Sequence, residues 1–150
     1  MYKKKGQAAL EFLMTYGWAI LAAIIVIGSS SAYLYLSQGT STNVFLNAPF
    51  YSFSASATSG VTAAAIRIEV ANNGRETLKN VVMDVTMDGN TCTSNQLISF
   101  PSNSRQIFDL DCTTALVENS NLNGKVDIEY FRPGSNLALK STGSVTTPVV

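Results

Sequence analysis

Histidine is missing from all 150 residues of this sequence. Because histidine is the commonest general base and metal ligand near neutral pH, its absence argues against catalysis and against a metal centre. Charged residues are also scarce, at 13% where about a quarter is usual. No glycine-rich phosphate loop and no nucleophile with a neighbouring base is present. We therefore expect no enzyme activity, no cofactor and no metal site.

A concentration of basic charge, as nucleic-acid binding would need, is found only at the start of the chain. The sequence has ten basic and ten acidic residues, and Lys3, Lys4 and Lys5 supply three of the basic ones. The remainder carries seven basic against ten acidic residues, a net charge of −3. Scattered basic residues form no stripe for a phosphate backbone, so no nucleic-acid partner is expected. They are Arg67, Arg75, Lys79, Arg105, Lys125, Arg132 and Lys140.

The lysines precede a long apolar segment. Between Ala8 and Leu36, Glu11 is the single carboxylate or base. Apolar residues fall on every helical face from Phe12 to Ile27, which is typical of a helix surrounded by lipid or protein. We predict a helix over residues 7–38, about 48 Å long and so longer than the roughly 30 Å hydrocarbon core of a bilayer. The lysine cluster places the N-terminus in the cytoplasm and the remainder outside.

Two ordinary interpretations of this segment remain open. It suits a permanent membrane anchor that keeps Lys3–Lys5, and it suits a secretory signal cleaved after Ser30-Ser31-Ala32, which would leave Tyr33 first. Neither interpretation explains Glu11, since a carboxylate inside a membrane costs up to about 3 kcal/mol at the centre.

A third interpretation rests on "KKKGQAALEF" and the following "LMTYGWAIL". This stretch, within residues 3–27, resembles the class III signal peptide of archaeal type IV pilins. The resemblance implies that a prepilin peptidase cuts between Gly6 and Gln7, one residue beyond the basic Lys5, and so removes residues 1–6. Archaellins usually have a glycine-rich start after the cut, which favours an adhesive pilus here. The resemblance to pilins further implies self-assembly into an extracellular filament that attaches to surfaces or cells. It also implies an assembly ATPase and a membrane platform as partners.

Cleavage at that position would give Glu11 a partner. It creates a free amine on Gln7, four residues before Glu11 and therefore on the same helix face. An unpaired charge in a dry bundle of helices is costly, so each Glu11 would pair with its own amine or that of a neighbouring subunit and fix the axial register. Alternatively, the carboxylate simply lies at the level of the lipid headgroups. Thr15, Ala19, Ala22 and Ala23 provide small positions for close helix packing.

The pattern changes after the helix. Residues 39–43 read as a polar linker, and residues 44–150 show alternation typical of half-buried strands separated by turns. About seven strands in about 105 residues suit an immunoglobulin-like sandwich, and "RIEVANNGRETLKNVVMDVTMDG" resembles such domains in other surface proteins. We thus expect an α+β chain, a long hydrophobic helix followed by an all-β domain. The expected strands are 44–54, 66–70, 81–87, 97–100, 105–111, 125–131 and 137–146.

The two cysteines, Cys92 and Cys112, lie in the part expected outside the cell, where disulfides persist. Cys112 shares strand parity with Phe108 and Leu110 and should point inward, toward Cys92. A disulfide closing this loop would stabilise the fold by about 3 kcal/mol. A redox-active pair is the alternative, although neither cysteine has a neighbouring base.

Three carboxylates deserve comparison with calcium sites. Asp109 and Asp111 lie two apart on one face of a strand, which fits a solvated surface or a weak calcium site. Asp88 opens "DGN", which lacks the further oxygen ligands and the closing glutamate of a calcium loop and so favours a hairpin turn.

No Asn-x-Ser/Thr sequon is present, which argues against an N-linked glycan.

Overall fold

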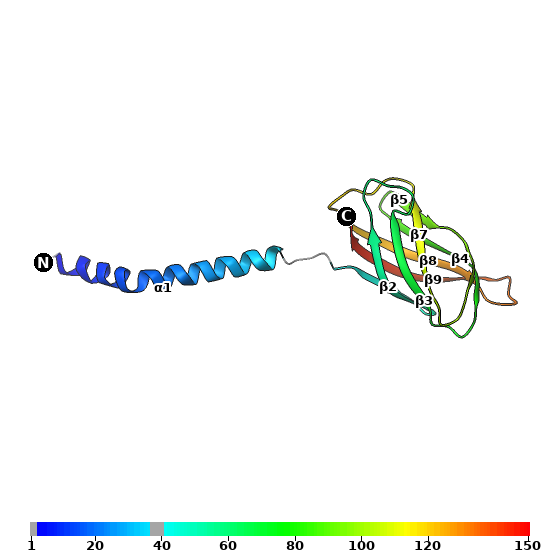
Figure 1. Ribbon diagram of the computed structural model, residues 1–150, viewed down its shortest axis with the longest axis horizontal. Helices are drawn as coiled ribbons and strands as arrows, with labels where there is room; N and C mark the ends of the chain where they lie inside the picture. The colour runs from blue at the N-terminus through cyan, green and yellow to red at the C-terminus, as the bar shows by residue number, and fades with distance from the viewer. Residues whose placement is uncertain (1–2, 37–40) are drawn as a thin grey trace. The chain divides into compact units, whose positions relative to one another are not determined.

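A computed structural model of the chain describes residues 3–36 and 41–150, which form a helical unit and a β unit (Figure 1). Helix α1 spans Lys3–Leu36, about 51 Å at about 1.5 Å per residue. The N-terminal apolar helix predicted from the sequence is thus confirmed. It begins at Lys3, before the predicted start at residue 7, because the lysines and Gly6 continue the same helix. The predicted end at residue 38 and the start of the linker at residue 39 lie outside the described residues.

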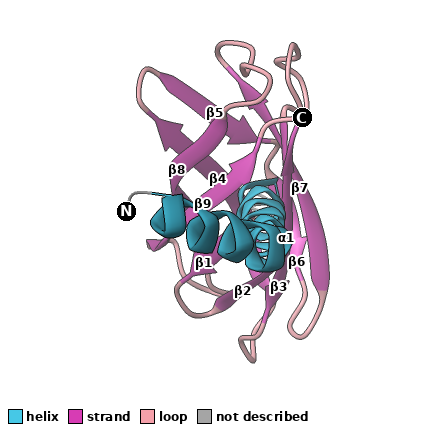
Figure 2. Cartoon of the chain, turned by 90° about the vertical axis from the view of Figure 1, so that its left-hand side faces the viewer, coloured by secondary structure: helices cyan, strands magenta, loops and turns pink. Residues whose placement is uncertain are grey.

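The β unit contains nine strands that pair antiparallel (Figure 2). They follow the order β1-β9-β8-β4-β5-β7-β3-β2, with β6 pairing β4 beside this path. The α+β class and the sandwich-like β domain are therefore confirmed. The strands are β1 Asn43–Leu46, β2 Phe50–Ala57, β3 Ile66–Asn72, β4 Leu78–Met87, β5 Asn90–Ser94, β6 Leu97–Phe100, β7 Arg105–Cys112, β8 Asn121–Phe131 and β9 Ala138–Pro148.

The sheet curls until its first and last strands meet, so that it is nearly barrel-shaped. The Ser52 hydroxyl on β2 donates a hydrogen bond to the Val44 carbonyl on β1 at 2.6 Å, and a parallel bridge links Ala57 to Val149. Gly143 of β9 pairs with Leu46 of β1, and a Cβ added at Gly143 would clash with the Phe45 carbonyl oxygen. Closure of this kind covers edge strands that would otherwise pair with other chains.

Two strands exceed the seven expected, and each has a local cause. The predicted strand 44–54 is divided into β1 and β2 around Pro49, which lacks the N–H that a central strand needs. Strand β5 was missed because "NTCTS" buries Cys92 and Ser94 and shows no alternation of large apolar residues. Strands β3 and β4 do not pair with each other; the "NNGRET" segment crosses between them instead of closing a hairpin.

The core follows the predicted alternation. Ile66, Ile68 and Val70 of β3 are buried, whereas Arg67 is exposed and Glu69 half-buried between them. A cluster of aromatic rings fills the part of the core near the 101–104 loop, with centroids 5.2–6.0 Å apart, distances typical of favourable aromatic pairs. These rings belong to Phe50, Phe100, Phe108 and Tyr130.

The disulfide between Cys92 and Cys112 is present, as predicted. The two residues lie directly opposite each other on β5 and β7, and both are buried. The inward direction expected for Cys112 is confirmed, together with that of Phe108 and Leu110. The bond joins β5 to β7, two neighbouring strands near the middle of the strand order.

Replacing both cysteines by alanine is expected to lower the free energy of unfolding by about 3 kcal/mol, because the unfolded chain then loses a loop constraint. Urea unfolding of the purified chain, followed by the circular dichroism of its strands, measures the difference. Reducing agent should destabilise the unmodified chain to a similar extent and leave the double variant unchanged. Equal stability of variant and unmodified chain would contradict the structural role.

The two ends of the β unit are defined by their loops. At the linker end, β1 begins at Asn43 opposite Thr146, beside the loops 58–65, 88–89 and 113–120. At the far end lie the loops 47–49, 73–77, 101–104 and 132–137, which connect the opposite ends of the same strands.

Candidate assembly site

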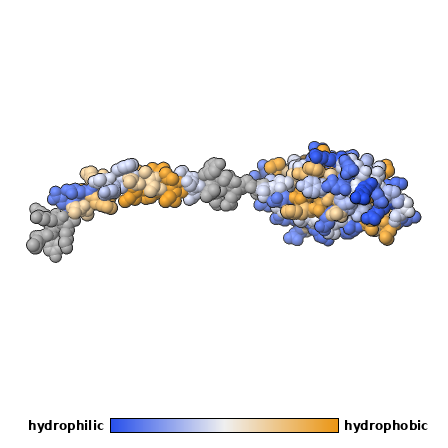
Figure 3. Space-filling view, turned by 90° about the horizontal axis from the view of Figure 1, so that it is seen from below, coloured by the Kyte–Doolittle hydropathy of each residue, from blue (hydrophilic) through white to orange (hydrophobic). Residues whose placement is uncertain are grey.

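Helix α1 is apolar and exposed on all its faces. Every large apolar side chain of the α1 segment 10–27 has more than half of its surface exposed, and Trp18 has 72%. Figure 3 shows hydrophilic colour near the beginning of the helix and hydrophobic colour over its later turns. These side chains are Leu10, Phe12, Leu13, Met14, Tyr16, Trp18, Ile20, Leu21, Ile24, Ile25, Val26 and Ile27.

The apolar stretch of α1 is long enough to cross a membrane. It covers Gly6–Ala32, 27 residues, and 0% of it is buried. About 20 apolar residues suffice to span a bilayer. Length and composition are therefore consistent with a membrane anchor or a signal sequence.

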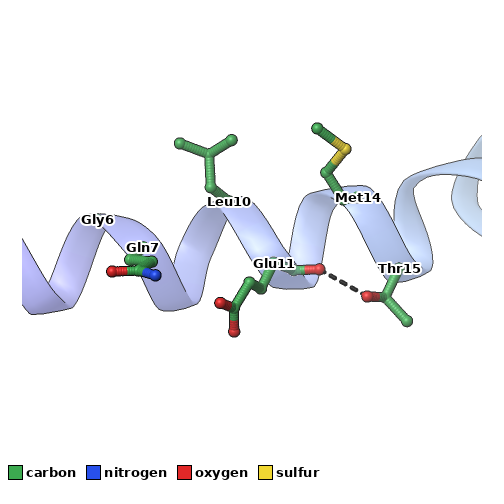
Figure 4. A pocket seen from close by; sticks show the side chains of 6 residues that line it. All are labelled: Gly6, Gln7, Leu10, Glu11, Met14 and Thr15. Atoms are coloured by element: carbon green, nitrogen blue, oxygen red, sulfur yellow. Dashed lines mark hydrogen bonds between the residues drawn. The ribbon is translucent and has the colours of Figure 1, made fainter.

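Gln7 and Glu11 lie on the same side of α1 (Figure 4). Both line a shallow, open groove on the helix surface together with Gly6, Leu10 and Met14. The Glu11 side chain extends away from the helix along one border of the groove, and the Leu10 and Met14 side chains extend along the other. The predicted sharing of one face by positions 7 and 11 thus agrees with the helix geometry.

Thr15 extends this polar face by one further turn. Its hydroxyl donates a hydrogen bond to the Glu11 carbonyl oxygen at 2.8 Å, so its polar group is satisfied within the helix. Thr15 was predicted only as a small position for close helix packing; the four-residue spacing of Gln7, Glu11 and Thr15 was the signal for a polar face.

The predicted processing site lies within regular helix. Gly6 and Gln7 are exposed, and Lys5 belongs to the same helix, although its side chain lies outside the described residues. The Gln7 amine forms only on cleavage, so its pairing with Glu11 stays a prediction.

Asp109 and Asp111 are both engaged by protein groups. Arg67 holds Asp109 through two hydrogen bonds, Nε to Oδ1 at 2.6 Å and Nη2 to Oδ2 at 3.2 Å. The Asp111 carboxylate accepts a hydrogen bond from the Ala64 amide at 2.6 Å. The hydrogen bonds from Arg67 lower the pKa of Asp109, and Asp109 in turn raises the pKa of Arg67. The pair joins β7 to β3 on the outer face of the sheet.

The pKa of Asp109 makes the stability of the β unit depend on pH. Because the folded pKa lies below that of the unfolded chain, the contribution is present above the unfolded value, near pH 4, and is lost as the pH falls through the folded value. We expect Arg67→Gln to raise the pKa of Asp109 toward its ordinary value. An NMR titration of the Asp109 carboxyl measures this shift; the same pKa in both proteins would refute the pairing.

The segment Asp88-Gly89-Asn90 forms the predicted hairpin turn. Met87 pairs with Asn90 across the turn between β4 and β5, and Gly89 takes the left-handed conformation, with φ of 76°. The Asn90 side chain bonds to the neighbouring 113–120 loop: it donates to the Thr114 carbonyl and accepts from the Thr113 hydroxyl. These hydrogen bonds therefore hold the turn between β4 and β5 against the 113–120 loop.

An aromatic surface on β2 was not predicted. Tyr51 and Phe53 are 56% and 44% exposed, with ring centroids 5.2 Å apart. The Arg105 guanidinium stacks 3.7 Å from the centroid of the Phe53 ring and lies 3.7 Å from the Glu69 carboxylate. The register of β2 against β3 shifts between Ser52 and Ser54, and such a bulge redirects side chains. Alternation places Tyr51 and Phe53 on the same face of β2, but it does not show that Arg105 of β7 stacks on that face.

Within residues 3–36 and 41–150, no group of three or more metal-binding side chains is found. Comparison of the chain with protein-family models, with curated proteins and with solved structures finds no significant match. The proposals below therefore rest on the sequence and on the geometry of the chain itself.

Proposed function

We propose that this chain is a structural subunit of an extracellular filament, a type IV pilin-like protein that serves adhesion to surfaces or cells. The precursor lies in the cytoplasmic membrane with its N-terminus in the cytoplasm. A prepilin peptidase cuts between Gly6 and Gln7, and an ATPase with a membrane platform assembles the cleaved chains through α1. The chain itself acts as a structural component and performs no reaction.

The observation that carries this proposal is the exposure of α1 on every face. Withdrawing each large side chain from water is worth about 1.5–3 kcal/mol, so burial of the helix gains tens of kcal/mol in total. None of the segment Gly6–Ala32 is buried. Lipid in the precursor, and the helices of other copies in a filament, would each provide the missing apolar surroundings.

A second observation distinguishes a filament subunit from a simple anchor. Glu11 lies in a segment whose other residues are apolar or small, on the same face as Gln7. Cleavage before Gln7 removes Lys3–Lys5, which would be expensive to bury in a filament core. The same cut creates an amine within reach of the Glu11 carboxylate, its own or that of a neighbour. The same cut would thus remove the positive charges of Lys3–Lys5 and supply a positive partner for the negative charge of Glu11.

N-terminal sequencing of the surface-exposed form tests the proposal, together with electron microscopy of sheared surface fractions. The expected first residue is Gln7, and the expected material is filamentous. A first residue of Tyr33 would show conventional secretion and end the filament proposal. A chain that keeps Lys3–Lys5 and is missing from every filament would show an anchored monomer.

A second candidate is a membrane-anchored or secreted surface-binding module with an immunoglobulin-like domain. The exposed surface of Tyr51, Phe53 and Arg105 favours it, because these residue types are enriched in binding interfaces. Under this alternative, the β unit functions without polymerisation. A Tyr51→Ser, Phe53→Ser variant would then lose binding to surfaces. Under the filament proposal, the property to measure is assembly, which depends on α1 instead.

A further inference from the structure

The linker end of the β unit carries exposed apolar side chains. Val61, in the 58–65 loop, is 40% exposed, and Val117, in the 113–120 loop, is 72% exposed. One backbone hydrogen bond joins the two loops, from the Gly60 amide to the Leu116 carbonyl at 3.1 Å, and a second, from the Ser120 amide to the Val117 carbonyl at 3.3 Å, closes a turn within the 113–120 loop. Val61 and Val117 each directly follow a residue of the first bond, so they lie on adjoining loops at this end.

Charge at this end is sparse and of one sign. The loops 58–65, 88–89 and 113–120 contain two charged residues, Asp88 and Glu118, and no basic residue. The loops of the far end are different: they contain Arg75, Glu76 and Arg132, and the last two are 3.9 Å apart. The two ends are thus chemically distinct, one apolar and weakly acidic, the other polar and charged.

Connectivity gives the apolar end a particular place in a polymer. Six residues, 37–42, separate the last residue of α1 from the first residue of β1, and a fully extended chain of this length spans at most about 25 Å. β1 begins at the linker end. In any filament whose core is made of α1 helices, this end is therefore close to the core, and the charged far end is free to face solvent.

A membrane surface is the less suitable occupant. An anionic bilayer surface attracts basic segments at about 1 kcal/mol per residue, whereas it would repel Asp88 and Glu118. Val61 and Val117 instead fit a partner that is apolar and bears no excess negative charge. The later turns of α1, from Ala19 to Ala32, have this character, since they contain no charged residue.

We propose that the linker-end surface formed by Val61 and Val117 binds α1 of a neighbouring copy of this chain, at the boundary between filament core and outer layer. This inference rests on the proposed filament function and specifies which surface of the β unit joins the polymer. Burial of the two valines replaces water by the apolar side chains of a neighbour. The contact supports the position of each outer domain, and the far end remains available to the surroundings.

The test introduces a carboxylate on this surface. Val117→Asp should fold, because the side chain lies exposed in a loop, but should lower the fraction of chain in sedimentable filaments at least about tenfold, since a charge would be buried without a partner. Leu137→Asp is the matched control: Leu137 is 68% exposed, also in a loop, and lies at the far end. Retained disulfide and unchanged thermal unfolding of the full chain verify folding of both variants.

Normal assembly of the Leu137→Asp chain with loss of assembly by the Val117→Asp chain supports the inference. Normal assembly of both chains overturns it and leaves the filament function intact. Equal loss in both chains also overturns it, because the two ends would then behave alike. If the unmodified chain forms no filaments, the proposed function itself fails. Val61→Asp provides a second variant on the same surface and should match Val117→Asp.

Discussion

Glu11→Gln is expected to leave membrane insertion intact and to reduce the yield of filaments at least about tenfold. Glutamine keeps the shape of the side chain but removes its charge, so the amine that cleavage creates on Gln7 would be buried without a counter-charge. Removal of one partner from a buried ion pair typically costs about 3–5 kcal/mol, which is more than a tenfold change in an association constant. Membrane fractionation and quantitation of sheared filaments measure the two effects separately.

Two comparisons make this experiment specific to the charge. Glu129→Gln removes one exposed carboxylate from β8 and changes the net charge equally, so it controls for charge outside α1 and outside the linker-end surface. N-terminal sequencing of the Glu11→Gln chain shows whether the peptidase still cuts before Gln7, which separates a processing defect from an assembly defect. A processed Glu11→Gln chain that forms filaments in normal amounts would show that Glu11 does not pair in the polymer.

The parts of the fold that could be predicted from the sequence are those in which burial imposes a period. In β3, Ile66, Ile68 and Val70 alternate with Arg67 and Glu69, because one face of the strand is buried and the other is not. In α1 the apolar residues occupy all faces, so the helix was recognised from composition and length alone. The parity of Cys112 was sufficient to place its side chain inward, since side chains alternate strictly along a strand.

Features that depend on long-range contacts could not be predicted in this way. Strand β5 exists because Cys92 lies opposite Cys112 and because β4 provides its other neighbour, whereas its own five residues are mostly polar. In the aromatic surface, alternation puts Tyr51 and Phe53 on one face of β2, but the stacking of Arg105 from β7 on Phe53 is a long-range contact that no local pattern shows. Under the proposed function, the candidate site on α1 is incomplete in a single chain, because the Gln7 amine and the neighbouring helices would come only with processing and assembly.

Asn72, at the end of β3, is another residue whose role depends on distant contacts. Its side chain is fully buried, and Nδ2 donates to the carbonyl oxygens of Glu76 at 2.9 Å, Phe100 at 3.1 Å and Pro101 at 3.2 Å. Its Oδ1 accepts a hydrogen bond from the Gly74 amide at 2.9 Å. One amide group thus satisfies the backbone of two loops at the far end, 73–77 and 101–104, which would otherwise have unpaired polar groups.

Asn72→Ala is expected to lower the free energy of unfolding by about 3 kcal/mol, because an unpaired buried polar group costs about 1–3 kcal/mol and the missing amide also leaves a cavity. Asn73→Ala is the matched control: the neighbouring side chain is exposed, so its loss should change stability by less than about 0.5 kcal/mol. Urea unfolding followed by strand circular dichroism compares the two. Equal stability of the Asn72→Ala and Asn73→Ala chains would contradict the role of Asn72, whereas a large difference identifies the two far-end loops as a unit held by a single side chain.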